Sequence, residues 1–417
     1  MIPQAGTSAF PAFRTCPLRV FSGCDTIRKK EVAAVRRFFC LMLALALLGL
    51  PSCSRGEEDS FVVVEDDSVL RPDPRRQARA LMRLMTEEEK VCQLFLVTPE
   101  MLTGEKYTLA LPEGNVFSRY PVGGVALYGQ NITSETQLAA LTASLQAQAR
   151  TAGMQPLFIG VHEAGGSLSR VAGKLGWPYA PEPEDMPGIA EDARQAGAYI
   201  GGYLAPLGIN LDFAVPLDMQ ITAESDVSGR TFGADPARVS LLAGGFAEGL
   251  REQGVVPCFG HFPNDGSLSK KNYYGTAVNR RSLEDMRRTE FLPYADQIAA
   301  GAEMIMMSHG VARGLGDDVP ASLSARMIGI LRQEMGYDGV VITESLRMPC
   351  IVSFYKPGEA AVLALQAGAD LVFLPSDLPA AVQAVFRALD TGSLTWDRID
   401  QSVERVLALK ISAGVIR

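Results

Sequence analysis

Carboxylate and imidazole side chains follow several short apolar runs in this chain. Glu344 comes directly after residues 340–343, and His261 comes soon after residues 255–258. Side chains of these two kinds act as nucleophiles, or exchange protons with a substrate, when a fold brings them together. The sequence therefore predicts a site for acid–base or nucleophilic chemistry. The polar residues found at the ends of such runs or soon after them are His162, Glu163, Asp212, His261, His309 and Glu344.

Metal and nucleotide chemistry lack the residue patterns that they need. The chain has 3 histidines and contains neither an HExxH nor a CxxC spacing, so we expect no metal site and no cofactor. The formal net charge is -8. Residues 1–53 hold 7 of the 39 Lys/Arg and 2 of the 47 Asp/Glu, so the remainder is more acidic still. This balance argues against nucleic acid as a partner.

Residues 1–53 have the features of an export signal. Basic residues between positions 28 and 37 precede an apolar run over 38–50, which is shorter than the roughly 20 residues of a membrane span. The tetrapeptide Leu-Pro-Ser-Cys that ends at Cys53 is similar to a bacterial lipoprotein processing site. We therefore expect an exported protein, periplasmic or anchored to the membrane through a lipid on Cys53. The alternative is an ordinary cysteine after a cleavage site.

The folded domain is expected over residues 76–417, after an acidic, proline-containing tether over residues 54–75. Eight short apolar runs recur in it. Continuous rather than alternating apolar runs indicate strands that are buried on both faces, as in parallel sheets. Eight such units predict an α/β fold, a (β/α)8 TIM-type barrel in a single domain, with a doubly wound open sheet as the alternative. The runs cover residues 93–97, 122–127, 157–161, 209–213, 255–258, 303–307, 339–343 and 371–374.

Helices are expected between these strands. Thr86 and Glu89 have the spacing of a capping box that begins a short helix. Residues 134–150 and 239–252 carry apolar side chains at helical spacing and end near a glycine. A barrel of this kind carries its chemistry at the carboxyl ends of its strands. The strands and the segments that follow them must therefore position the polar side chains named above.

Five segments of the chain resemble bacterial glycoside hydrolase family 3, and most closely its β-N-acetylhexosaminidase branch, over roughly residues 78–412. They occur in the order that the family has, through the whole predicted domain. The resemblance implies the same barrel fold and the hydrolysis of O-glycosyl bonds. The segments are Val122 to Asn131, Asn210 to Asp218, Gly229 to Pro236, Gly260 to Pro263 and Gly336 to Glu344.

The resemblance also implies roles for individual residues. Glu344 stands at the position of the family's nucleophile, an aspartate, with its carboxylate one methylene further out. The family's acid–base pair of Asp and His falls on Lys271 and Tyr273, and neither residue repeats its chemistry. Positions that bind the sugar or shape its pocket fall on Arg230, His261, Asp212 and His309, while His162 and Glu163 replace other residues of a sugar-contacting motif.

Structural interpretations of several of these residues stay open. Asp212 and Asp218 are also typical of caps on loops after strands. An ion pair with an acidic neighbour is the alternative interpretation of Arg230. His261 fits a buried histidine with a satisfied hydrogen bond. Glu344 is the exception, because a carboxylate at the mouth of a barrel is costly unless it is partnered or used.

Two functions fit the resemblance, with terminal β-N-acetylglucosamine in cell-envelope glycans, such as peptidoglycan fragments, as the expected partner. The first is a β-N-acetylhexosaminidase with Glu344 as nucleophile and an altered proton donor, for which Glu163 is a candidate. The second is a catalytically inactive glycan-binding lipoprotein, because losing a general acid costs about 10²–10⁴ in rate. A scaffold without sugar binding is the third and least favoured alternative.

Overall fold

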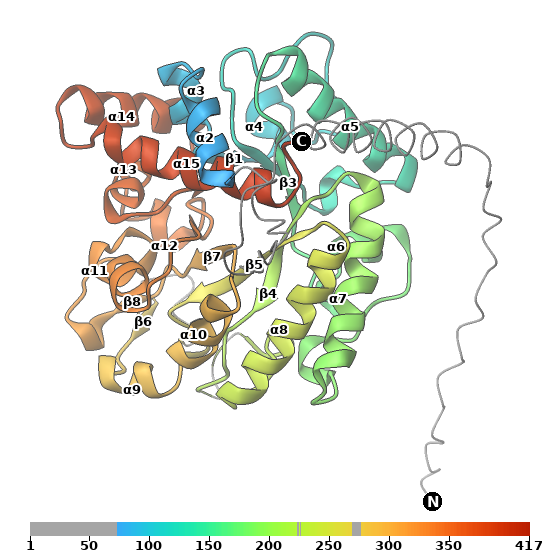
Figure 1. Ribbon diagram of the computed structural model, residues 1–417, viewed down its shortest axis with the longest axis vertical. Coiled ribbons are helices and arrows are strands. Elements are labelled where there is room, and N and C mark those ends of the chain that lie inside the picture. Colours follow the sequence, from blue (N-terminus) through green and yellow to red (C-terminus); the bar gives the residue numbers. More distant parts are fainter. Residues whose placement is uncertain (1–72, 223–224, 226, 269–276) are drawn as a thin grey trace, which may run out of the picture. The chain divides into compact units, whose positions relative to one another are not determined.

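Eight parallel strands form the centre of the structure (Figure 1). The structure is a computed structural model that describes residues 73–222, 225, 227–268 and 277–417. Each barrel strand falls on one of the eight apolar runs, so the predicted strand positions are confirmed. The strands are β1 Phe95–Val97, β2 Gly124–Ala126, β3 Phe158–Val161, β4 Leu211–Pro216, β5 Val256–Phe262, β7 Met304–Met307, β9 Val340–Thr343 and β10 Val372–Phe373.

The order of the strands closes the sheet into a barrel. Hydrogen-bonded neighbours run β10-β1-β2-β3-β4-β5-β7-β9, and a parallel bridge between Ile342 in β9 and Leu371 beside β10 joins the two ends. The strands follow one another around the barrel in chain order, whereas a doubly wound sheet reverses direction at an internal switch point. The (β/α)8 prediction is therefore confirmed, and the open-sheet alternative is wrong. A separate small sheet pairs β6 (Val278–Asn279) with β8 (Val311–Ala312).

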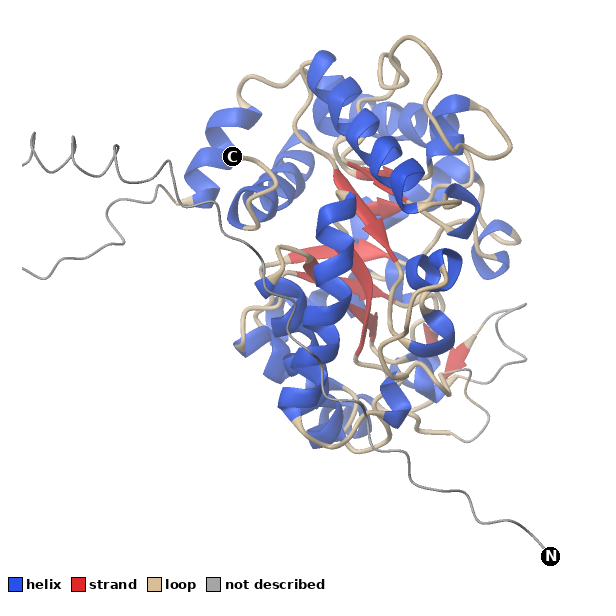
Figure 2. Ribbon diagram, turned by 90° about the vertical axis from the view of Figure 1, so that its right-hand side faces the viewer, coloured by secondary structure: helices blue, strands red, loops and turns tan. Residues whose placement is uncertain are grey.

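Helices surround the strands (Figure 2), which explains why the strand sequences are apolar on both faces. The predicted capping box forms, since the Thr86 N–H donates to Glu89 Oε2 at 2.7 Å and the Glu89 N–H donates to Thr86 Oγ1 at 3.2 Å. The helices are α2 Pro74–Met82, α3 Glu87–Cys92, α4 Pro99–Thr103, α5 Glu135–Thr151, α6 Arg170–Leu175, α7 Ala190–Leu204, α8 Pro236–Glu252, α9 Leu283–Arg288, α10 Phe291–Ala299, α11 Ala325–Gly329, α12 Pro349–Val352, α13 Pro357–Ala367, α14 Leu378–Asp390 and α15 Trp396–Ser412.

Several sequence predictions lie outside the described residues. These are the export segment with Cys53, most of the tether over 54–75, and the two positions Lys271 and Tyr273. The first described helix, α2, begins at Pro74, two residues before the predicted start of the domain. Within the described ranges, no helix has the length and apolar character needed to cross a membrane.

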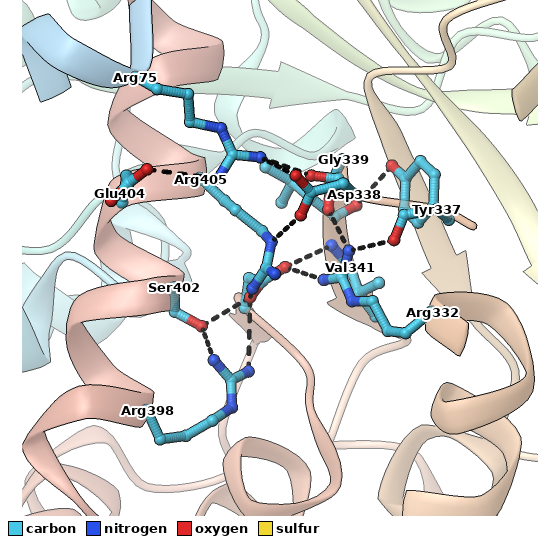
Figure 3. A network of polar contacts seen from close by, with 12 residues as sticks. Arg75, Arg332, Tyr337, Asp338, Gly339, Val341, Arg398, Ser402, Glu404 and Arg405 are labelled. Atoms are coloured by element: carbon cyan, nitrogen blue, oxygen red, sulfur yellow. Dashed lines mark hydrogen bonds and ion pairs between the residues drawn. The ribbon is translucent and has the colours of Figure 1, made fainter.

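A buried charged cluster lies where the strands begin, at the end of the barrel opposite the predicted site. Asp370 is fully buried and stands two residues before β10. Its carboxylate forms ion pairs with Arg332, Arg398 and Arg405, and the Val341 N–H of β9 donates to its Oδ2 at 3.0 Å. Figure 3 shows the three arginines converging on this point. The cluster joins the last helix, α15, to the starts of two neighbouring strands.

An exposed extension of this cluster holds the first described helix in place. Arg75 of α2 lies 2.8 Å from Asp338 Oδ2, and Arg405 Nε of α15 lies 3.0 Å from Asp338 Oδ1. Asp338 comes two residues before β9. The chain therefore enters the barrel at the amino-terminal ends of its strands, on the side away from the predicted chemistry.

Candidate active site

A cavity of about 150 Å³ opens at the carboxyl ends of β3, β4 and β5. This is the end at which barrels of this class carry their chemistry. His162 follows β3, His261 belongs to β5, and Arg230 lies in the segment before α8. The structure brings these three predicted residues to one cavity. Its charged and aromatic lining residues are His162, Arg170, Phe213, Asp218, Arg230 and His261.

A hydrogen-bonded cluster of Asp218, His261 and Asp265 forms one wall of the site. Asp218 lies two residues after β4, and its Oδ2 is 2.8 Å from His261 Nδ1. Its other oxygen, Oδ1, accepts the backbone N–H of Asp265 at 2.7 Å. The Asp265 carboxyl approaches the same imidazole nitrogen at 3.7 Å and accepts a hydrogen bond from the Ser308 hydroxyl. Two strand ends and the turn that follows β5 are thereby tied together.

The charge state of His261 follows from this pairing. Burial alone would lower the pKa of His261, but the charge of Asp218 and the hydrogen bond to it outweigh burial and raise the pKa to about 10. In the same way, burial would raise the pKa of Asp218, but His261 holds it below its usual value. The pair is thus an imidazolium and a carboxylate at neutral pH. An imidazolium donates hydrogen bonds well, but with this pKa it cannot exchange protons near pH 7.

Glu344 lines a second, smaller depression of about 10 Å³ with Asp265, Ser308 and His309. The His261–Asp265 contact connects this depression to the larger cavity. Glu344 follows β9, is 8% exposed, and accepts the backbone N–H of His309 on its Oε2 at 3.1 Å. The carboxylate that was predicted to be the nucleophile therefore lines this depression, with one oxygen held by a backbone donor.

His309 orients Glu344 through its backbone, while its ring is fully engaged elsewhere. Nε2 lies 2.9 Å from the carbonyl oxygen of Ser345, which can only accept, so Nε2 carries a proton. Nδ1 lies 2.7 Å from the Ser322 hydroxyl. Burial lowers the pKa of His309, so the ring is neutral and Nδ1 accepts from Ser322. His309 therefore fixes the position of two loops rather than presenting a free ring to a sugar.

Glu163 and Asp212 point away from the cavity. The Glu163 carboxylate accepts the N–H groups of Val171 and Ala172 in α6, at 2.8 and 3.1 Å, and the Tyr203 hydroxyl at 2.7 Å. Asp212 Oδ1 accepts the N–H of Glu163 at 3.0 Å. Both carboxylates are fully buried and hold β3, β4 and α6 together. The geometry favours the structural interpretation of Asp212, and it removes Glu163 from reach of a bound sugar.

His162 faces the cavity as a neutral ring among aromatic side chains. Its centroid lies 5.1 Å from that of Phe213 and 6.2 Å from that of Phe373. Burial and the nearby charge of Arg170 lower the pKa of His162 to about 3. Its Nδ1 is buried without a hydrogen-bond partner among the described residues. The cavity thus combines flat apolar surfaces with cationic donors, as sites that bind small polar ligands do.

The donor atoms of Asp218, His261 and Asp265 lie within 4.8 Å of one another, which invites comparison with a metal site. A metal requires an unprotonated nitrogen. Because the pKa of His261 is about 10, the nitrogen between the two carboxylates carries a proton at neutral pH. The arrangement fits a hydrogen-bonded ion pair better than a set of metal ligands.

Asp265 is the site residue that sequence reasoning missed. It follows the segment from Gly260 to Pro263 that was recognised for its family resemblance, but it was not singled out. Its side chain is 4% exposed and shares the depression with Glu344. A carboxylate within three residues of a strand that ends at the site was the signal available in the sequence. Only the fold places it in one depression with a second carboxylate, Glu344.

These features define a class of protein, a barrel with paired carboxylates at the carboxyl ends of its strands. Residues 86–409 match the family model described as the glycosyl hydrolase family 3 N terminal domain. The chain belongs to this family, so the predicted resemblance is confirmed.

Several known relatives of the chain are beta-hexosaminidases of this family. The beta-hexosaminidase LpqI of Mycobacterium tuberculosis is 31% identical over 352 residues, which cover 81% of this chain and 87% of the relative. The solved structure titled M tuberculosis LpqI matches with a TM-score of 0.70 at 28% identity, over 81% of this chain and 96% of that one. A family 3 beta-N-acetylglucosaminidase from Paenibacillus sp. matches with a TM-score of 0.74 at 32% identity. That match covers 79% of this chain and 63% of the longer Paenibacillus chain.

Proposed function

We propose that this protein binds a terminal β-N-acetylhexosamine residue of a glycan and hydrolyses its glycosidic bond with Glu344 as the nucleophile. The observation that carries the proposal is that Glu344 shares a depression with Asp265, which in turn contacts His261 of the ion pair Asp218–His261, at the carboxyl end of a family 3 barrel. Its hexosaminidase relatives supply the substrate class. A retaining glycosidase needs a carboxylate that attacks the anomeric carbon and a second group that handles the proton of the leaving oxygen.

The residues that line the cavity offer both polar and apolar contacts to a sugar. The His261 imidazolium and the Arg230 guanidinium donate to sugar hydroxyl or acetamido oxygens. The flat faces of Phe213 and His162 pack against the apolar side of a pyranose ring. Glu344 is charged when it attacks, and the N–H of His309 fixes its orientation. Binding energy held in these contacts positions the anomeric carbon near the carboxylate.

A non-catalytic glycan receptor is the second candidate, and one observation favours it. The histidine nearest the site, His261, is held as an imidazolium with a pKa of about 10 and so cannot serve as the proton shuttle. Glu344 is also longer by one methylene than the aspartate that the family resemblance implies. If no other group transfers the proton, the pocket binds a glycan but does not hydrolyse it.

For location and partner, we propose an exported lipoprotein that acts on peptidoglycan fragments. The chain enters the barrel through α2, where Arg75 contacts Asp338 at the amino-terminal ends of the strands. An anchor at Cys53 would attach through a tether to that end. The cavity at the opposite end would then stay open to glycans of the cell envelope.

The experiment compares the purified protein with Glu344→Gln and the matched control Glu135→Gln, an exposed residue in the first turn of α5. Each is assayed for hydrolysis of an aryl β-N-acetylglucosaminide and for calorimetric binding of N-acetylglucosamine oligomers. Turnover that Glu344→Gln abolishes and Glu135→Gln preserves supports the enzyme. Binding without turnover in the unaltered protein supports the receptor instead. If the unaltered protein shows neither binding nor turnover, the enzyme and the receptor are both refuted.

A further inference from the structure

We propose that Asp265 is the proton donor and acceptor that works with Glu344, in place of the family's loop acid–base pair. This inference rests on the proposed hydrolysis and adds a catalytic residue to it. Asp265 begins the short 3-10 turn Asp265–Ser267, which follows the end of β5 and is held in place by that strand. It lines the same small depression as Glu344.

The contacts of Asp265 leave one carboxyl oxygen available. Oδ1 accepts the hydroxyl hydrogen of Ser308, whose oxygen in turn accepts the N–H of Gly310 at 2.8 Å. Among the described residues, Oδ2 accepts no hydrogen bond, and it lies 3.7 Å from His261 Nδ1. A carboxyl held by one oxygen, in the same depression as the proposed nucleophile, has the arrangement that a general acid needs.

The other candidates on the described part of the chain are each engaged elsewhere. The Glu163 carboxylate is bonded to α6 and Tyr203. The Asp218 carboxylate carries the charge that holds His261 protonated. The ring of His309 is hydrogen-bonded to the Ser322 hydroxyl and to the backbone carbonyl of Ser345. Asp265 is the remaining carboxyl that faces the depression.

The charges around Asp265 favour its protonated form. Burial and the charge of Glu344 raise the pKa of Asp265 to about 7, against the opposing effect of the His261 imidazolium. The Asp218 carboxylate adds to the increase, and the Ser308 hydroxyl works against it. Among the described residues, the Tyr294 hydroxyl and the Cys350 thiol also face Asp265, and both are neutral at this pH because burial raises the pKa of each. Two carboxyls in one site, one protonated and one charged, match the division of roles in retaining glycosidases.

The proposed reaction balances in two steps. In the first, a Glu344 oxygen forms a bond to the anomeric carbon as the glycosidic bond breaks, and the Asp265 carboxyl gives its proton to the departing oxygen. In the second, Asp265, now a carboxylate, takes a proton from water while the water oxygen bonds to the anomeric carbon and Glu344 is released. Asp265 ends protonated, and one water is consumed.

The test measures hydrolysis by the purified protein and by Asp265→Asn of two β-N-acetylglucosaminides, one with an alkyl leaving group and one with a dinitrophenyl leaving group. A dinitrophenolate departs without a proton. Asp265→Asn should therefore lose about 10²–10⁴-fold in kcat/KM on the alkyl substrate and far less on the dinitrophenyl substrate. Added azide, which attacks the glycosyl–enzyme without needing a base, should speed the variant on the dinitrophenyl substrate and yield the glycosyl azide. The exposed Asp397→Asn in α15 is the control and should behave as the unaltered protein.

A pH profile of the unaltered protein tests the role of Asp265 even if the Asp265→Asn variant does not fold. Its kcat/KM should fall above a pKa of about 7, and Asp265→Asn should lack that limb. Equal losses on both substrates, no azide product, or a flat profile in the unaltered protein would each overturn the role of Asp265. If Glu344→Gln abolishes turnover while Asp265→Asn does not change it, this inference fails and the proposed hydrolase stands. If the unaltered protein hydrolyses neither substrate, both fail.

Discussion

Replacing Asp370 by asparagine should destabilise the barrel strongly without altering the glycan cavity. The side chain is fully buried and its two oxygens serve five donors. Oδ1 meets Arg398, Arg405 and the Ser402 hydroxyl, and Oδ2 meets Arg332 and the Val341 N–H. An asparagine has one acceptor oxygen and no charge. Whichever way its amide is turned, an NH₂ group then faces donors, and three partly buried guanidinium groups lose their shared counter-charge.

The magnitude follows from the burial of this carboxylate. Removing one partner of a buried ion pair costs about 3–5 kcal/mol, because the remaining charge is left uncompensated. Asp338 offers a matched comparison, since it pairs with Arg75 and Arg405 in the same network (Figure 3) but its side chain is 68% exposed. An exposed pair of this kind contributes about 0–1 kcal/mol. The structure thus predicts a clear difference between two Asp→Asn changes in one network.

The assay is urea unfolding of the unaltered protein, Asp370→Asn and Asp338→Asn, followed by circular dichroism. With a urea dependence of about 3 kcal/mol per molar or steeper for a chain of this size, Asp370→Asn should lower the midpoint by about 1 M. Calorimetric binding of N-acetylglucosamine oligomers to the folded variant should be unchanged, because the cluster lies at the opposite end of the barrel. An Asp370→Asn variant that unfolds at the same urea concentration as Asp338→Asn would refute the reasoning.

Two further predictions concern the site itself. The pKa of about 10 keeps His261 charged between about pH 6 and about pH 9, so its hydrogen bonds to a glycan should persist over this range. In Asp218→Asn, the largest charge that raises this pKa is lost, so calorimetric titrations should weaken at a lower pH than in the unaltered protein. Glu163→Gln should hydrolyse an aryl β-N-acetylglucosaminide at the unaltered rate, because the Glu163 carboxylate holds α6 and does not face a substrate. Its free energy of unfolding in urea should fall by about 1–3 kcal/mol. A large loss of rate in the folded variant would contradict this placement.

The fold was predictable from the sequence because its signals are local. Each barrel strand overlaps a short apolar run, and a continuous apolar run is by itself the sequence signal of a strand buried on both faces. The helix that begins at Glu87 follows from two side chains three positions apart, Thr86 and Glu89. Long motifs in family order then identified the barrel. None of these inferences required knowledge of which residues meet across the fold.

The site could be located from the sequence, but its chemistry could not. Strand ends narrowed the search to residues such as His162 and Glu163, which are neighbours in the chain. Both residues follow β3, and the local path of the chain turns the His162 ring to the cavity and the Glu163 carboxylate to α6. Which of two adjacent residues faces a substrate depends on the path of the chain after β3.

The sequence by itself determined the family, the eight strands and the position of the candidate nucleophile. The tertiary structure decided the charge states and the partner of that nucleophile. His261 meets Asp218 across 43 positions of the chain, and Glu344 meets the N–H of His309 across 35. A pKa depends on the charges and the solvent within a few ångströms of a group, and for these residues the fold alone supplies those neighbours.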